Sequence, residues 1–128
     1  MAEETVLQSS LIVFGNDNIL IVRIKEGVTI DLKQAKIMND NMKRHAANGK
    51  IPVLMDTRVR YSWDKDAQQY IAENSEWRLA TAVLSDNPFS RLLSNTYVKL
   101  FKPSYPIKLF TEEEKAMEWL KGMQDSSR

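Results

Sequence analysis

The chain has 128 residues with 18 basic and 17 acidic side chains, so its formal net charge is only +1. This length fits one domain, and a composition of 43% hydrophobic and 27% charged residues excludes global disorder. The absence of cysteine excludes disulfides, thiolate metal sites and a thiol nucleophile, and it suits a reducing, cytoplasmic location. We expect a single domain over residues 1–128, with an ordered core of about residues 5–122.

Charge and hydropathy argue against a signal peptide, a membrane-spanning segment and a nucleic-acid partner. The N-terminal sequence MAEETVLQSS is acidic and lacks the basic region of a signal peptide. The apolar runs Leu11–Phe14 and Ile19–Val22 are too short to cross a bilayer, so we expect no transmembrane segment. A nucleic-acid partner is not expected, because only Arg58 and Arg60 form a local basic pair.

The first elements in chain order are a hairpin and a helix. Two branched apolar runs, Leu11–Phe14 and Ile19–Ile24, flank Gly-Asn-Asp-Asn, a sequence suited to a tight reversal with positive φ. The second run should end at Lys25-Glu26-Gly27. A helix is predicted from Asp31, with Asp31 as N-cap and Gln34 completing a capping box, up to Asn48-Gly49.

Buried strands and helices then alternate. Pro52–Met55 and Leu79–Leu84 are apolar without alternation, as in parallel strands covered on both faces. Asp64 can cap the helix between them. The remaining expected elements are a helix from Asn87-Pro88 to about Leu100, a strand at Ile107–Phe110, and a last helix capped by Thr111 and Glu114 and ending near Gly122.

The predicted fold class is therefore α/β, with a mixed, mostly parallel sheet, an N-terminal antiparallel hairpin and four helices in the order ββαβαβαβα. Parallel strands joined by helices require right-handed crossovers, so the helices should cover the sheet. Ligands or partners of such sheets meet the loops at the carboxyl ends of the strands.

Four aspartates lie near that edge, namely Asp56, Asp64, Asp66 and Asp86. If three of them converged, their oxygens could hold Mg²⁺. We favour a simpler interpretation, in which Asp64 and Asp66 stabilise a helix N-terminus and Asp86 lies in a turn. No metal and no other cofactor is therefore assigned.

Catalytic patterns are missing from the sequence. The single histidine, His45, falls near the end of the first helix, where a partly buried imidazole or a cation at the helix C-terminus explains it. Ser62, Ser85 and Ser90 lie in no GxSxG motif, and the four glycines form no phosphate-binding loop. We therefore expect a protein that is not an enzyme.

The segment from Arg58 to Trp63 joins a buried strand to a helix, yet it carries Arg58, Arg60, Tyr61 and Trp63. Aromatic residues and arginine are enriched at the centres of protein interfaces. Alternatively, Tyr61 or Trp63 folds back as a hydrophobic staple on the following helix while the arginines are solvated. Both interpretations stay open on the sequence.

Several phrases, in this order and spacing, resemble the STAS domains, the SpoIIAA-like fold of anti-sigma-factor antagonists, and more closely small bacterial STAS-like or SEC14-like proteins of undefined function. The phrases are Lys25–Asp31, Pro52–Arg58, Lys102-Pro103 and Pro106–Thr111. The resemblance runs from about Leu11 to Leu120. It implies a sheet with an N-terminal antiparallel element and a role in protein–protein regulation.

In the antagonist type of this family, a serine in an Asp-Ser-Ser-Gly motif at the start of a helix is phosphorylated by the partner kinase. The matching stretch here is Asp64-Lys65-Asp66-Ala67, which places Asp66 at the phosphosite-equivalent position. An aspartate imitates phosphate only weakly, because it has one charge and fewer oxygens. This departure argues against control by phosphorylation at that position.

The function expected from the sequence is a non-enzymatic STAS-like regulatory or protein-interaction module. An alternative is a carrier or sensor of a small apolar or lipid-like ligand, as the SEC14-like resemblance implies, and this requires a closed apolar cavity. A homodimer is a further possibility, because an edge strand and a helix face could be left uncovered. The expected partner-binding residues are Arg58, Arg60, Tyr61, Trp63, Asp64, Asp66, Asp86 and Asn87.

Overall fold

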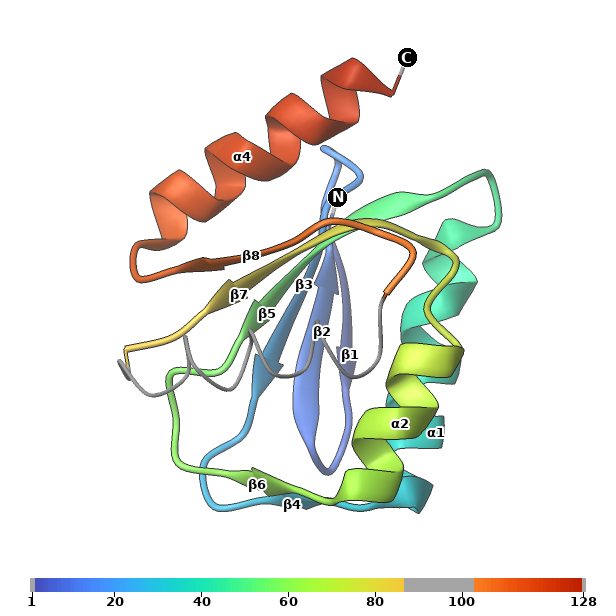
Figure 1. Cartoon of the computed structure of the whole chain (residues 1–128), viewed down its shortest axis with the longest axis vertical. Coiled ribbons are helices and arrows are strands. Elements are labelled where there is room, and N and C mark those ends of the chain that lie inside the picture. Colours follow the sequence, from blue (N-terminus) through green and yellow to red (C-terminus); the bar gives the residue numbers. More distant parts are fainter. Residues whose placement is uncertain (1, 87–102, 128) are drawn as a thin grey trace.

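A computed structural model describes residues 2–86 and 103–127 of the chain. Their centre is a six-stranded sheet in the order β1-β2-β3-β5-β7-β8 (Figure 1). β1, β2 and β3 are antiparallel neighbours, whereas β3, β5, β7 and β8 run parallel. The strands of this sheet are β1 (Glu3–Val6), β2 (Ser10–Phe14), β3 (Leu20–Ile24), β5 (Ile51–Asp56), β7 (Arg78–Leu84) and β8 (Ile107–Phe110).

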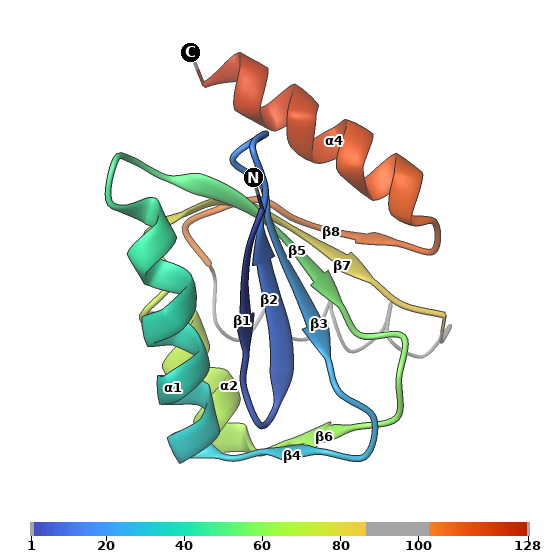
Figure 2. The same cartoon turned by 180° about the vertical axis from the view of Figure 1, so that it is seen from behind.

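Helices cover both faces of this sheet. α1 (Leu32–Lys43), which continues into the short 3-10 helix η1 (Arg44–Ala46), packs beside α2 (Lys65–Glu73). α4 (Glu113–Ser126) lies on the opposite face, as the two views in Figures 1 and 2 show. A second, two-stranded parallel sheet of β4 (Thr29–Ile30) and β6 (Ser62–Trp63) follows the carboxyl ends of β3 and β5.

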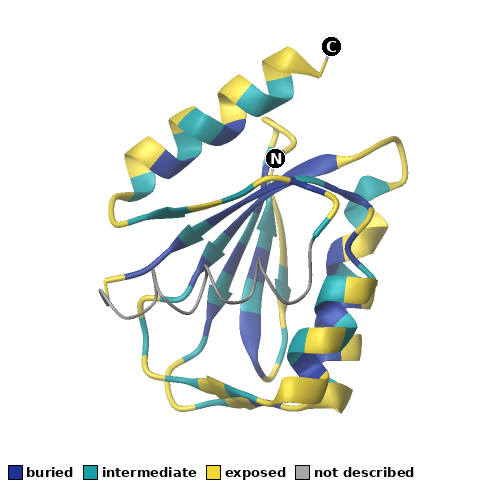
Figure 3. Ribbon diagram, in the orientation of Figure 1, coloured by how far each residue is buried: buried dark blue, intermediate teal, exposed yellow. Residues whose placement is uncertain are grey.

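The core is divided by the sheet into two clusters, because successive side chains of a strand point to opposite faces. On β5, Val53 belongs to the cluster under α1 and α2, while Leu54 belongs to the cluster under α4. Both residues are fully buried, and the central strands form the buried interior visible in Figure 3. The prediction that the Pro52–Met55 strand is covered on both faces is confirmed.

The predicted hairpin is also confirmed. β2 and β3 pair with Ser10 opposite Ile24 and Phe14 opposite Leu20. Asn18 takes the left-handed conformation with φ 61°, and its amide donates to the carbonyl of Gly15 over 3.2 Å. An asparagine tolerates this conformation better than most residues, which explains the choice of turn sequence.

The order ββαβαβαβα was incomplete in two places. β1 was missed, because Glu3-Glu4-Thr5-Val6 has mostly exposed side chains and therefore no apolar signal. β4 and β6 were missed because each has only two residues. Gly27 makes this second sheet possible: it bends the chain with φ 78°, and its amide donates to the carbonyl of Arg60 over 2.7 Å.

The predicted starts of α1 and α2 were right in position but only partly right in chemistry. The Asp31 carboxylate accepts from the Gln34 amide over 2.8 Å, whereas the Gln34 side chain turns away from the capping box and donates to Gln8. Asp64 is the N-cap residue of α2, but its side chain makes no capping hydrogen bond.

The capping box predicted for the last helix is wrong. α4 begins one residue later than expected, with Glu112 at the N-cap and no side-chain cap, and its first residue Glu113 forms ion pairs described below. The helix also continues past Gly122 to Ser126.

Three α-helices lie in the described parts of the chain. The third of the four predicted helices, from Asn87-Pro88 to about Leu100, lies outside the described residues. Over residues 2–86 and 103–127, no helix is long and apolar enough to cross a membrane.

Candidate functional site

The carboxyl edge of the sheet holds a group of four interacting charges, which we call the ion cluster: Arg23, Asp56, Arg58 and Glu113. Arg23 and Asp56 are register partners on the adjacent parallel strands β3 and β5. Strand alternation points both side chains to the α4 face, because Leu54, two residues before Asp56, packs in the cluster under α4. Glu113 is the first residue of α4 and joins them from the helix.

Asp56 is the centre of the ion cluster and is 8% exposed. One carboxylate oxygen accepts from Arg23 Nη1 over 2.7 Å and from Arg58 Nη2 over 3.0 Å. The other accepts from Arg58 Nε over 2.9 Å and from the Arg58 backbone amide over 3.2 Å. Every lone pair that could bind a cation therefore already faces an N–H donor.

Glu113 closes the cluster from the α4 side. Its two carboxylate oxygens accept from Arg23 Nη1 over 2.8 Å and Nη2 over 3.3 Å, a bidentate pair. A longer contact of 3.4 Å joins Glu113 to Arg58. The ion cluster thus fixes the first turn of α4 to the ends of β3 and β5.

The electrostatics of the ion cluster favour the charged forms of both carboxyl groups. Burial works to raise the pKa of Asp56, but the hydrogen bonds from Arg58 and Arg23 outweigh it and hold that pKa below its ordinary value. The hydrogen bond from Arg23 lowers the pKa of Glu113 against a smaller opposing effect of burial. Neither carboxyl group is placed to act as a general acid near neutral pH.

The predicted partner-binding residues separate into three environments. Arg58 belongs to the ion cluster, and Asp86, which is exposed, lies near it. The pKa of the Arg58 guanidinium is raised first by its hydrogen bond to Asp56 and to a smaller extent by Asp86. Asn87 lies outside the described residues.

The two aromatic residues of the segment point inward. Tyr61 and Trp63 are half-buried, and both pack against the core cluster under α1 and α2. Burial raises the pKa of the Tyr61 hydroxyl, with a smaller opposing effect from a hydrogen bond to Thr57. The rings therefore anchor the segment to the core.

The remaining predicted residues are Arg60, Asp64 and Asp66. Together with Ser62 they form what we call the ribbon surface, and all four are exposed. β6 holds this surface in place through the pairing of Thr29 with Ser62 and of Ile30 with Trp63. Within the described parts of the chain, Arg60, Asp64 and Asp66 form no ion pair. Asp66, at the phosphosite-equivalent position, lies in the first turn of α2, where a negative charge is favourable.

The four aspartates do not make a cation site. Among residues 2–86 and 103–127, no group of three or more histidine, aspartate or glutamate side chains is placed to hold a metal ion. Asp56 is occupied by arginines, and Asp64 and Asp66 are exposed at the start of α2. The hypothesis of a magnesium site at the strand ends therefore has no support in this part of the structure.

Sequence reasoning missed Arg23 and Glu113 as members of a site. The available signal was Arg23 itself, since it is the only charged residue in the apolar run Ile19–Ile24. A charge in a strand covered on both faces needs a partner of opposite sign. Asp56 was noticed, but it was grouped with other aspartates instead of with arginines.

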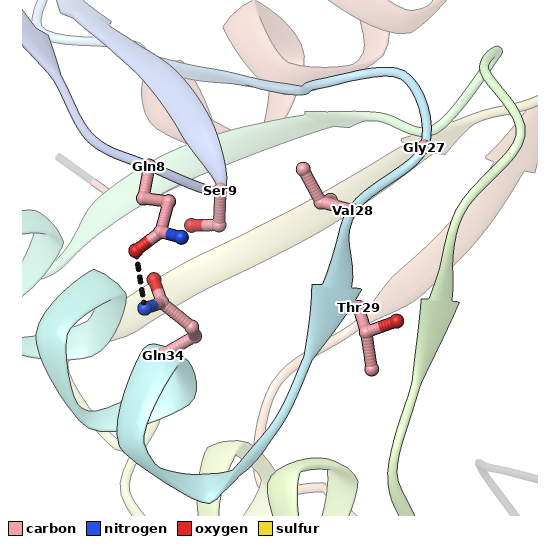
Figure 4. Close-up of a pocket in the computed structure, with 6 residues that line it drawn as sticks. All are labelled: Gln8, Ser9, Gly27, Val28, Thr29 and Gln34. Atoms are coloured by element: carbon pink, nitrogen blue, oxygen red, sulfur yellow. Dashed lines mark hydrogen bonds between the residues drawn. The ribbon is translucent and has the colours of Figure 1, made fainter.

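A half-open pocket of about 350 Å³ lies on the other side of β4 from β6 (Figure 4). Its walls come from the turn between β1 and β2, the chain between β3 and β4, and the first turn of α1. It is lined by Gln8, Ser9, Gly27, Val28, Thr29 and Gln34. This half-open site is not the closed apolar cavity that a lipid-like ligand requires.

The fold agrees with a solved structure of low sequence identity. An uncharacterized protein of the DUF3478 family from Shewanella loihica PV-4, which has a SpoIIAA-like fold, superposes with a TM-score of 0.59 at 11% identity. The similarity covers 94% of this chain and 92% of that one. The resemblance to the SpoIIAA-like fold predicted from the sequence is thereby confirmed.

The sequence comparisons place the chain in a family without a known activity. The search of curated proteins found no match. A family model matches residues 13–124, which include both the ion cluster and the ribbon surface. The chain therefore belongs to the family described as Domain of unknown function (DUF7793).

Proposed function

We propose that this protein is a non-enzymatic, STAS-like interaction module that binds a protein partner through the ribbon surface. The observation that carries the proposal is the contrast in charge pairing at the carboxyl edge. The ion cluster satisfies its own charges, whereas Arg60, Asp64 and Asp66 are exposed and form no ion pair among the described residues.

The backbone of the ribbon surface is fixed before a partner binds. Its backbone is fixed by bonds from Ser62 N to the Val28 carbonyl over 3.0 Å and from Asp64 N to the Ile30 carbonyl over 2.9 Å. Tyr61 and Trp63 anchor it from below. A partner would therefore meet charges that are already positioned, which lowers the entropic cost of binding.

The charges on the ribbon surface suggest the chemistry of the partner. Arg60 precedes the acidic start of α2 in the chain and forms no ion pair with it, so a complementary protein surface would present an acidic group beside basic ones. Such complementary charges set orientation and association rate more than affinity. The position of Asp66 at the start of α2, where the antagonists that the sequence resembles carry their regulatory serine, supports the same surface.

A matched pair of lysines tests this proposal. Lys65 lies between Asp64 and Asp66 at the start of α2, whereas Lys121 is exposed on α4, on the other face of the sheet. Each lysine is replaced in turn by a photoactivatable lysine analogue in the cells that make the protein. A specific protein adduct from position 65, absent from position 121, is expected. Equal adducts from both positions, or none from either, would refute the ribbon surface as a binding site.

A further inference from the structure

The pocket in Figure 4 contains an amide group with incomplete hydrogen bonding. Gln34 Nε2 donates to Gln8 Oε1 over 3.1 Å, and the two side chains face each other across the wall of the pocket. Gln34 Oε1 is buried and has no hydrogen-bond partner among residues 2–86 and 103–127. An unpaired buried carbonyl loses its hydration without compensation, at a cost of about 1–3 kcal/mol.

Gln34 is placed by a helix, whereas Gln8 is placed by an exposed turn. Gln34 is in the first turn of α1 and is half-buried, and its backbone amide is fixed by Asp31. Gln8 lies in the turn between β1 and β2, its residue is exposed, and the bond to Gln34 is the only one its side chain makes within the described chain. Rotation of Gln8 would free the Nε2 donor of Gln34 beside its unpaired Oε1.

A carboxamide is the group that complements the uncovered Gln34 side chain. Its carbonyl oxygen would accept from Gln34 Nε2 in place of Gln8, and its N–H would donate to Gln34 Oε1, which Gln8 leaves unpaired. Among the described residues, no lysine, arginine or carboxylate lines the pocket, so this wall selects against charged ligands. Val28 offers an apolar contact for the rest of the ligand.

We propose that this pocket binds a small uncharged ligand through a primary carboxamide, which displaces the Gln8 side chain from Gln34. The volume of about 350 Å³ is within the usual range for small-molecule sites. At about 30 Å³ for each water molecule in the liquid, this volume corresponds to roughly ten water-sized groups. The proposal is independent of the ribbon surface, because it uses none of that surface's side chains.

Benzamide and benzoate form a matched pair of probes, since they have the same shape but only benzamide is an uncharged amide. Binding is measured by titration of the full chain while following the ¹H–¹⁵N signals of residues 27–29 and of the glutamine side chains. Benzamide should shift these signals in a saturable way, and benzoate should not. Equal binding of both probes, or no saturable shift by benzamide, would overturn the proposal.

Two substitutions should change the affinity for benzamide in opposite directions. Gln34→Met keeps the length of the side chain but removes both hydrogen-bonding groups, so benzamide affinity should fall by about tenfold. Gln8→Ala removes the competing internal amide, so affinity should rise by about threefold, because the competent state no longer has to be opened. The dispersion of the spectra reports that each variant is folded. Unchanged affinity in folded Gln34→Met, or reduced affinity in Gln8→Ala, would contradict the displacement of Gln8.

Discussion

The ion cluster and the ribbon surface both contain arginine and acidic residues. The ion cluster lies at the carboxyl ends of β3 and β5, and the ribbon surface lies in the chain that follows β5. In the ion cluster, Asp56 is nearly buried and receives hydrogen bonds from two guanidinium groups. On the ribbon surface, Arg60 and Asp66 are exposed and unpaired within the described residues. The difference shows that residue type and position at this edge do not separate structural charges from charges available to a partner; burial and pairing do.

The largest effect is expected on breaking the ion cluster at its centre. Asp56→Asn keeps the shape of the side chain but removes the charge that pairs with Arg23 and Arg58, so the free energy of unfolding should fall by about 2 kcal/mol. Urea denaturation followed by circular dichroism measures this change. Asp66→Asn is the matched control, and its exposed position predicts a change below about 0.5 kcal/mol. Similar losses of unfolding free energy in the two variants would show that the ion cluster stabilises the fold no more than the ribbon surface does.

The pH dependence of the free energy of unfolding should also differ between wild type and Asp56→Asn. The folded-state pKa values of Asp56 and Glu113 are lowered, so the unfolded chain binds more protons in acid. The stabilisation is complete above the unfolded pKa values of about 4 and is lost as pH falls through the lower folded values. The gap in stability between wild type and Asp56→Asn should therefore be widest near neutral pH and should narrow below about pH 4. A gap that stays constant down to pH 2.5 would contradict the pairing.

His45 contributes to acid sensitivity at higher pH. It is half-buried, its ring stacks on Phe14 with centroids 4.7 Å apart, and burial lowers its pKa, followed by the charge of Arg44. The partly buried imidazole, one of the two explanations for this residue, is therefore confirmed. Its contribution is complete above the unfolded pKa of about 6.5 and falls as the pH drops through the lower folded value. As the pH falls, the stabilisation by His45 is lost before the stabilisation by the carboxylates. The loss at His45 is the same in wild type and in Asp56→Asn.

The architecture was readable from the sequence wherever burial left a periodic or continuous apolar pattern. The strands at 52–55, 79–84 and 107–110 and the hairpin turn at Asn18 were predicted on that basis. β1 and the β4–β6 pair carry few buried side chains, so their pairing depends on backbone hydrogen bonds that any sequence can make.

The candidate site was only half predictable for a related reason. The segment from Arg58 to Asp66 stood out by composition, but its division into inward rings, paired Arg58 and solvated Arg60 depends on contacts distant in sequence. Glu113 is 57 positions beyond Asp56, and local spacing gives no sign that α4 begins beside the end of β5. Only the sheet order brings these residues together.

A double variant of the ribbon surface should have the smallest effect on stability and the clearest effect on partner binding. Arg60→Ala combined with Asp66→Ala removes two exposed charges of opposite sign, so the free energy of unfolding should change by less than about 0.5 kcal/mol. Adduct formation from the photoactivatable lysine at position 65 should nevertheless fall by roughly fivefold, corresponding to about 1 kcal/mol of binding free energy.

A charge-matched control on α4 separates local recognition from a general effect of surface charge. Glu118→Ala combined with Lys121→Ala also removes one charge of each sign from exposed positions, on the opposite face of the sheet. This control should leave both stability and the adduct at position 65 unchanged. If it reduces the adduct as much as the ribbon variant does, the partner is drawn by overall charge, and the unpaired charges of the ribbon surface carry no specificity. If only the ribbon variant reduces the adduct, the exposed charges of the ribbon surface recognise the partner.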